Sequence, residues 1–251
     1  MILVQILKNK STDILIPSAY KLAIQLGKTF GVLNLVDSDE RVEDSLKNLK
    51  SLSGLTENQI FVRNSKTNTL SSVCEELEAS FLFIQLSDNK LIRRQLNDCR
   101  DLRIPYLFYK DSFGELDLKK VILPIGFLEE ELEKAQFAAA FGRFCGSEIY
   151  MLLANDYGSK AAVNAQKMKT LFDKFEFKYT LEKAAKDSFK VEAESIQVAN
   201  NEHAGIIIVS ASRDYGLDDI LFGPKEYHVV KKSPVPVLLV NPRGDLYALC
   251  D

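Results

Sequence analysis

The sequence predicts an α/β protein made of two similar, doubly wound parallel-sheet domains in tandem. Three observations predict this fold. Short apolar runs alternate with longer amphipathic stretches along the 251 residues, which is the order of strands and helices around a parallel sheet. The strongest runs are apolar nearly throughout, as in strands that are covered on both faces. The same order of runs then occurs a second time.

The first half, which we assign to a domain of residues 1–117, contains five short apolar runs. Two of the stretches between them, residues 15–26 and 69–77, carry apolar residues at helical spacing. The second of these stretches follows the polar residues 65–68, which mark a helix start. We expect strands at residues 2–7, 32–36, 59–62, 81–86 and 106–109.

The second half, residues 118–251, repeats this order after a polar, turn-rich linker. Landmarks recur in step: Gly27 and Gly142 each fall in the last turn of a first helix, and Pro105 and Pro236 each open a last strand. Such a duplication predicts two domains with the same fold. We expect helices at residues 128–145, 161–175 and 189–198, and strands at 121–125, 148–153, 177–181, 206–209 and 237–240.

Composition excludes several classes of protein. The formal net charge is −3 and the chain has no basic block, so a broad cationic face for nucleic acid is not expected. No apolar run reaches the roughly 18–20 residues of a membrane span, and the opening run lacks the basic start of a signal peptide. We therefore expect a cytoplasmic protein that binds neither nucleic acid nor membranes.

The sequence also argues against metal and catalytic sites. Its four cysteines have no zinc-site spacing, and its two histidines lie far apart, so we expect no metal. None of the common nucleophile, phosphate or metalloprotease motifs occurs. The acidic residues 129–131 are interpreted as dipole partners and solvated charge at a helix start. We expect no catalytic residues and therefore no enzyme.

The most informative segment lies between two predicted strands near the end of the chain. The run 205–210 leads into the loop Ser210-Ala-Ser-Arg-Asp-Tyr-Gly216, and a helix-like stretch after Gly223 leads to the apolar run 236–240. In α/β proteins, ligands lie where such a loop leaves the carboxyl end of a strand. The layout is that of a phosphate-binding turn.

These residues resemble the universal stress protein family in a tandem arrangement. The resemblance is carried by Gly216-Leu-Asp-Asp-Ile-Leu-Phe-Gly223, by the ending Ser233-Pro-Val-Pro-Val-Leu-Leu-Val240 and by the opening Lys119-Lys-Val-Ile-Leu-Pro-Ile125. It covers nearly the whole chain and is strongest in the second half. It implies the adenine-nucleotide α-hydrolase-like fold, with five-stranded parallel sheets of order 3-2-1-4-5. It also implies pairing of domains through their last strands, either within the chain or in a homodimer.

Many members of that family bind ATP with the pattern G-x2-G-x9-G-[ST]. The four positions here are Ser210, Arg213, Gly223 and Pro224, so that only one matches. Glycines let backbone N–H groups approach phosphate, and proline lacks the N–H that a helix start offers to an anion. Glu226, in the first turn of the following helix, adds negative charge nearby.

The other end of the family's nucleotide site is altered as well. The position of the nucleotide-contacting Asp after the first strand is Gly126, and a family Ser or Thr two residues later is Leu128. In the first half, the corresponding loop of residues 87–90 is too short to cradle phosphate. We therefore expect no cofactor, with ATP disfavoured.

Three classes of function remain. The sequence favours a stress-response or regulatory protein that acts without ATP, through interaction with a protein partner. The alternative is a module that binds a nucleotide or another small ligand in the second domain. Arg213 would then be either a phosphate clamp or a solvated loop residue. A third class, an enzyme of a related nucleotide-binding superfamily, lacks its motif here. The candidate ligand-binding residues are Gly126, Ser210, Ser212, Arg213 and Gly223.

Overall fold

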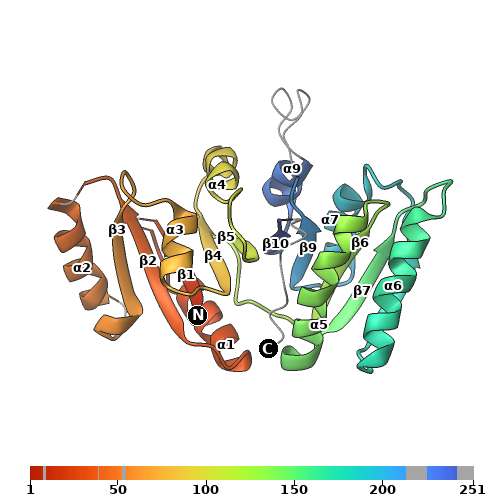
Figure 1. Ribbon diagram of the computed structural model, residues 1–251, viewed down its shortest axis with the longest axis horizontal. Coiled ribbons are helices and arrows are strands. Elements are labelled where there is room, and N and C mark those ends of the chain that lie inside the picture. The colour runs from red at the N-terminus through yellow and green to blue at the C-terminus, as the bar shows by residue number, and fades with distance from the viewer. Residues whose placement is uncertain (8–9, 39, 53–54, 213–224, 242–251) are drawn as a thin grey trace. The chain divides into compact units, whose positions relative to one another are not determined.

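The structure is a computed structural model that describes residues 1–7, 10–38, 40–52, 55–212 and 225–241. The chain forms two compact units, Met1–Glu115 and Leu116–Asp251 (Figure 1). Within each unit, parallel strands are joined in the order third, second, first, fourth, fifth. This confirms the doubly wound α/β fold and the strand order that the resemblance implies.

The first unit contains five strands in the order β3-β2-β1-β4-β5. Its central strand, β1, pairs in parallel with both β2 and β4. The strands are β1 (Ile2–Ile6), β2 (Phe30–Val36), β3 (Ile60–Asn64), β4 (Phe81–Leu86) and β5 (Tyr106–Lys110). The helices are α1 (Leu15–Gln25), α2 (Glu40–Leu52), α3 (Leu70–Glu76) and α4 (Ile92–Asp98), with 3-10 turns η1 (Glu57–Gln59) and η2 (Asn89–Leu91).

The second unit has the order β10-β9-β6-β7-β8, in which β6 is central. In Figure 1, α5 and α6 lie on one face of this sheet and α7 lies on the other. The strands are β6 (Lys120–Ile125), β7 (Glu148–Leu153), β8 (Tyr179–Lys183), β9 (Ile206–Ser210) and β10 (Val237–Val240). The helical elements are η3 (Glu129–Leu132), α5 (Glu133–Cys145), α6 (Lys160–Lys174), α7 (Val191–Asn201) and α9 (Lys225–Lys232).

The buried central strands explain why the apolar runs predicted the fold. Ile2, Leu3 and Val4 of β1 are all fully buried, although neighbouring side chains of a strand point to opposite faces. Both faces of the sheet are therefore covered, and a polar residue on either face would be costly. The edge strand β8 is mostly exposed, so its sequence is less apolar and indicated a strand only weakly. The predicted bounds, 177–181, lie two residues before the observed ones.

Two helices of the first unit were not given bounds from the sequence. In α2, charged residues are frequent and Leu49 is buried, so the apolar stripe is thin. In α4, only seven residues are helical, and Ile92 and Leu96 are the apolar residues that it buries. Short helices of this kind depend on packing against the sheet more than on their own sequence.

The pairing of Gly27 with Gly142 was wrong. Gly27 lies just after α1 with φ +62°, in the left-handed conformation that favours glycine at a helix end. Gly142 lies inside α5, whereas Gly146 ends that helix with φ +68°. Gly146 is therefore the counterpart of Gly27. The predicted helix 128–145 also begins differently, because residues 129–132 form the 3-10 turn η3 before α5.

Gly205 provides a test of the packing in the second unit. Its amide donates to the carbonyl of Lys120 at 3.0 Å, and a Cβ atom at this position would overlap the carbonyl oxygen of Asp117. We expect Gly205→Ala to lower the free energy of unfolding by about 1–3 kcal/mol or more, because the backbone of Asp117 must move. Gly158→Ala is the matched control, since nothing lies within 4 Å of its Cβ position. Urea denaturation of both variants measures the difference, and equal stability would contradict the packing described.

Candidate functional site

The candidate sites lie where the strand order reverses in each sheet. This point falls between β1 and β4 in the first unit and between β6 and β9 in the second. At such a switch point, the loops after neighbouring strands leave in opposite directions and open a crevice at the carboxyl ends. Ligands of open α/β sheets bind there.

In the second unit, the structure brings three of the predicted site residues to this edge. Gly126 directly follows β6, Ser210 is the last residue of β9, and Ser212 lies two residues further on. The two strands are parallel neighbours, with Ile122 opposite Ile207, so they end at the same edge of the sheet. Arg213 and Gly223, together with Pro224, lie outside the described residues.

In the loop after β6, a buried carboxylate accepts the hydrogen bond of the strand-end amide. We call a strand end whose donors are paired in this way closed. Glu131 Oε2 accepts a hydrogen bond from the Gly126 amide at 2.7 Å and lies 3.1 Å from Lys134 Nζ. Both side chains are buried, Lys134 completely. Asn164 Nδ2 donates to the carbonyls of Gly126 at 3.0 Å and Leu128 at 2.9 Å. The backbone polar groups of this loop are thus paired with the chain's own side chains.

Glu131 was interpreted from the sequence as a dipole partner with solvated charge, and this was wrong. The 3-10 turn η3 directs Glu131 inward, whereas Glu129 pairs at the surface with Lys167 at 2.8 Å. The Lys167 ammonium beside Glu129 lowers the pKa of that carboxyl. The three-residue spacing of Glu131 and Lys134 places them on one helical face, which is the only local signal of their pairing.

The Glu131 carboxylate also occupies the space next to Gly126. A Cβ atom at position 126 would lie 2.7 Å from Glu131 Oε1 and 3.0 Å from Ser188 Oγ. The position at which the family carries a nucleotide-contacting Asp therefore has no room for a side chain while Glu131 is in place. The glycine at position 126 thus leaves the space that the Glu131 side chain fills.

The described start of the loop after β9 is paired in the same way. Glu226, in the first turn of α9 and 1% exposed, accepts hydrogen bonds from the Ser212 amide at 3.0 Å and the Ser212 hydroxyl at 2.8 Å. Ser210 is buried at the end of its strand. The sequence predicted negative charge near this loop, and the Glu226 carboxylate in fact accepts hydrogen bonds from both donors of Ser212.

The loop after β8 in the second unit shows the same pattern. Its Ser188 donates both its amide and its hydroxyl to the carboxylate of Asp156, which follows β7. After β8, Glu194 accepts from the amides of Ala185 and Lys186, each at 2.8 Å. Amides at such an edge are the donors that anionic ligands use. In these described loops, internal carboxylates accept from them instead.

A cavity of about 350 Å³ lies beside the loop after β6, between Phe127 and Lys167 of α6. Asn164 and Val163 also line it, but its lining includes none of the three predicted site residues that the structure describes. The ring of Phe127 contacts that of Phe189 edge to face, with centroids 5.4 Å apart. Space for a small molecule therefore exists in this unit next to the predicted site.

In the first unit, a neutral side chain pairs with the amide at the end of β1. Gln85, which is 1% exposed, accepts from the Leu7 amide at 2.8 Å through Oε1. Its Nε2 donates to the Ser11 carbonyl at 2.7 Å and to Asp111 Oδ1 at 2.8 Å. The loop after β1 is thereby held to β4 and to the residue after β5 without a buried carboxylate at the amide.

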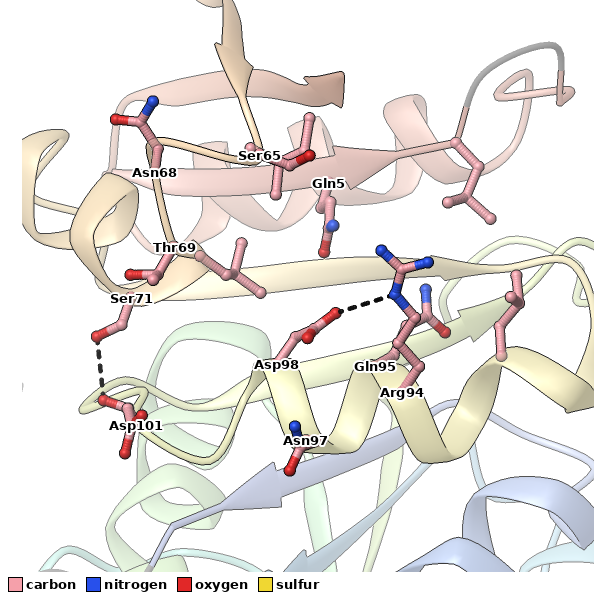
Figure 2. A pocket seen from close by; sticks show the side chains of 14 residues that line it. Gln5, Ser65, Asn68, Thr69, Ser71, Arg94, Gln95, Asn97, Asp98 and Asp101 are labelled. Carbon is pink, nitrogen blue, oxygen red and sulfur yellow. Dashed lines mark hydrogen bonds and ion pairs between the residues drawn. The ribbon is translucent and has the colours of Figure 1, made fainter. Parts of the chain in front are cut away.

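A cavity of about 450 Å³ opens at this edge of the first unit (Figure 2). It lies over the ends of β1, β2 and β3, between the start of α3 and one side of α4. Burial raises the pKa of the Asp98 carboxyl at its rim, and the nearby Arg94 guanidinium opposes that shift. The sequence did not predict this cavity, because its lining comes from four separate segments of the chain.

No helix in the described part of the chain is long and apolar enough to span a membrane. Among the same residues, no group of three or more His, Cys, Asp or Glu side chains is placed to hold a metal ion.

The fold is shared with universal stress proteins of known structure. A universal stress protein from Archaeoglobus fulgidus is 13% identical, with a TM-score of 0.64, and the match covers 97% of both chains. A functionally unknown protein from Pseudomonas aeruginosa PAO1 is 13% identical, with a TM-score of 0.63, over 96% of this chain and 92% of the other. A putative universal stress protein from P. aeruginosa UCBPP-PA14 is 14% identical, with a TM-score of 0.58 and the same coverage.

By sequence, no family model and no curated protein matches this chain. The structural matches therefore carry the comparison, and at this level of identity they show the fold. Each of the three extends over at least 96% of this chain, so that both units are included in the likeness.

The buried pair of Glu131 and Lys134 gives a sharp test of the closed site. Lys134→Met leaves the Glu131 carboxylate buried without its cation, and we expect a loss of about 3–5 kcal/mol in the free energy of unfolding. The double variant Glu131→Gln with Lys134→Met keeps an acceptor for the Gly126 amide and should regain most of that loss. Lys167→Met, which breaks the exposed pair with Glu129, is the control and should change little. Urea denaturation measures the free energy of unfolding. If Lys134→Met and Lys167→Met lower it equally, Glu131 is not buried with Lys134 as described.

Proposed function

We propose that this chain is a stress-response or regulatory protein of the universal stress protein type, and that it acts without ATP through interaction with another protein. The fold and the motifs around residues 216–223 and 233–240 support the first part. The closed strand ends of the second unit support the second part. The proposal includes the absence of catalytic activity and of a cofactor.

The observation that carries the proposal is the pairing of strand-end donors with internal carboxylates. The amides of Gly126 and Ser212, at the ends of two neighbouring strands, donate to Glu131 and Glu226. A phosphate would have to displace these carboxylates, and hydrogen bonds to charged groups contribute about 1.5–3 kcal/mol each. It would also approach the negative charge of Glu226, whereas the charge of Glu131 is balanced by Lys134. The arrangement therefore opposes a polyphosphate ligand.

A ligand-binding role in the second unit is the second candidate. The cavity of about 350 Å³ between Phe127 and α6 favours it, since small-molecule sites begin near this volume. Such a ligand would lie beside the closed strand ends and would need no phosphate. The pairing of the two domains through their last strands, and a homodimer, stay predictions of the sequence.

A titration with ATP tests the proposal. We expect a dissociation constant no tighter than about 100 μM, that is, a binding free energy weaker than about −5.5 kcal/mol. The physical reason is that Pro224 and Arg213 remove phosphate contacts and Glu226 occupies the donors of Ser212. Isothermal titration calorimetry measures the constant. A low-micromolar value, or ATP released from the purified protein, would contradict the proposal.

A matched pair of variants tests whether the Glu226 carboxylate weakens the binding of ATP. Glu226→Gln removes a buried negative charge at the loop and should tighten ATP binding, whereas Glu176→Gln, at an exposed turn after α6, should leave it unchanged. Equal affinities for these two variants and the wild type would mean that the Glu226 carboxylate does not oppose the nucleotide.

A further inference from the structure

Helix α1 of the first unit has a second apolar side, which is exposed. Its Leu15, Leu22 and Ala23 are buried, whereas Ile24 is 63% exposed and Tyr20 47%. Residues four apart lie on the same face of a helix, so Tyr20 and Ile24 form one exposed apolar stripe. Polar and charged residues are usual on the side of a helix that faces solvent. Packing within the unit therefore does not account for this stripe.

A cavity of about 430 Å³ opens beside the stripe. Tyr20, Ala23 and Ile24 of α1 line it, together with Phe30 at the start of β2 and with residues 58–59 before β3. The rings of Tyr20 and Phe30 meet edge to face, with centroids 5.5 Å apart. The cavity thus lies at the amino ends of the strands, whereas ligands of this fold bind at the carboxyl ends. It is also distant in the strand order from the edge strand β5.

The second unit shows which group occupies the corresponding place there. Gly27 and Gly146 follow the ends of α1 and α5 in the same left-handed conformation. Ala23 precedes Gly27 by as many residues as Gly142 precedes Gly146. A Cβ atom at Gly142 would lie 3.1 Å from the ring of Phe177, which comes just before β8. In the second unit, an aromatic ring therefore packs directly on the first long helix.

In the first unit, the segment before β3 supplies no such ring. Asn58 and Gln59 are the residues of this segment that line the cavity, and both are polar. The place that a phenylalanine fills beside α5 is thus open beside α1. The comparison of the two units indicates what the cavity accepts, namely an aromatic side chain from outside the unit.

The lining also indicates the charge of the occupant. Lys28 is exposed and is the only charged side chain that lines the cavity. Glu57 is next to Asn58 in the sequence but is not part of the lining. An acidic group beside the aromatic ring would therefore be attracted to the Lys28 ammonium, and a basic group would be repelled.

We propose that the exposed side of α1 and the cavity beside it bind a segment of another protein that carries an aromatic side chain next to an acidic residue. The ring enters the cavity between α1 and Phe30, and the carboxylate lies near Lys28. Aromatic anchors in pockets supply much of the binding energy of protein interfaces. This inference rests on the proposed function, because it names the surface through which the chain would bind its protein partner.

Peptide titrations of the full chain, followed by NMR of alanine and isoleucine methyl groups, test the chemistry of the partner. The probes are the capped tripeptides Glu-Phe-Glu, Glu-Ala-Glu and Lys-Phe-Lys. We expect Glu-Phe-Glu to bind with a dissociation constant of about 1 mM and to shift the methyl signals of Ala23 and Ile24. Glu-Ala-Glu should shift neither signal, and Lys-Phe-Lys should bind at least about threefold more weakly. If Glu-Phe-Glu shifts neither signal at about 10 mM, or if the three peptides bind equally, the proposal is wrong.

Two variants at exposed positions locate the site. Ile24→Ser and Lys28→Glu should change the thermal unfolding little. We expect Ile24→Ser to weaken the binding of Glu-Phe-Glu about threefold to tenfold, and Lys28→Glu to reverse the preference between the acidic and the basic peptide. Leu181→Ser, at an exposed position on β8, is the matched control and should bind as the wild type does. Unchanged binding to both Ile24→Ser and Lys28→Glu would overturn the proposal.

Sedimentation equilibrium separates a different partner from a second copy of this chain. We expect the wild type and Ile24→Ser to have the same mass. A wild-type dimer that becomes a monomer in Ile24→Ser would assign the surface to self-association and contradict the proposal. The ATP titration tests the proposed function separately, since tight binding of ATP contradicts that function, whereas a failure of the peptides to bind contradicts only the α1 surface.

Discussion

The ends of parallel strands impose the constraint on which this structure depends. Each strand leaves the sheet with backbone N–H groups that lack a partner in the next strand, and buried N–H groups must be paired. In the second unit, carboxylates of the chain itself meet this need after β6, β8 and β9. The loops are thereby held without a ligand, and the fold is complete around a site that would otherwise attract an anion.

The two units meet the same constraint with different chemistry. In the first unit, the Leu7 amide is paired with the neutral Gln85, and Gln95 is held through Gln85 with its own oxygen unused. In the second, Glu131 needs the buried cation of Lys134 to balance its charge. The same strand order thus supports strand ends that are paired with carboxylates in the second unit and a cavity beside a neutral side chain in the first. This agrees with the rule that fold does not determine function.

Much of the fold could be predicted from the sequence, and less of the candidate site. The apolar runs mark β1 and β9 because both faces of these strands are buried. The site was harder because Glu129 and Glu131 look alike in sequence. The structure separates them by their partners, since Glu129 pairs at the surface with Lys167, whereas Glu131 is buried with Lys134 and the Gly126 amide. Gln95 carried no signal at all, because its hydrogen bond goes to β4 and the cavity beside it is built from four segments of the chain.

Hydrogen exchange at the amides of Gly126 and Ser212 tests the central claim most directly. The chain's own carboxylates hold these N–H groups at 2.7 and 3.0 Å, so both amides should exchange slowly in the free protein, and ATP at about 10 μM should not change their rates. Glu226→Ala should accelerate exchange at Ser212 and leave Gly126 as it is. Fast exchange of both amides in the free protein, with protection appearing when ATP is added, would contradict the account.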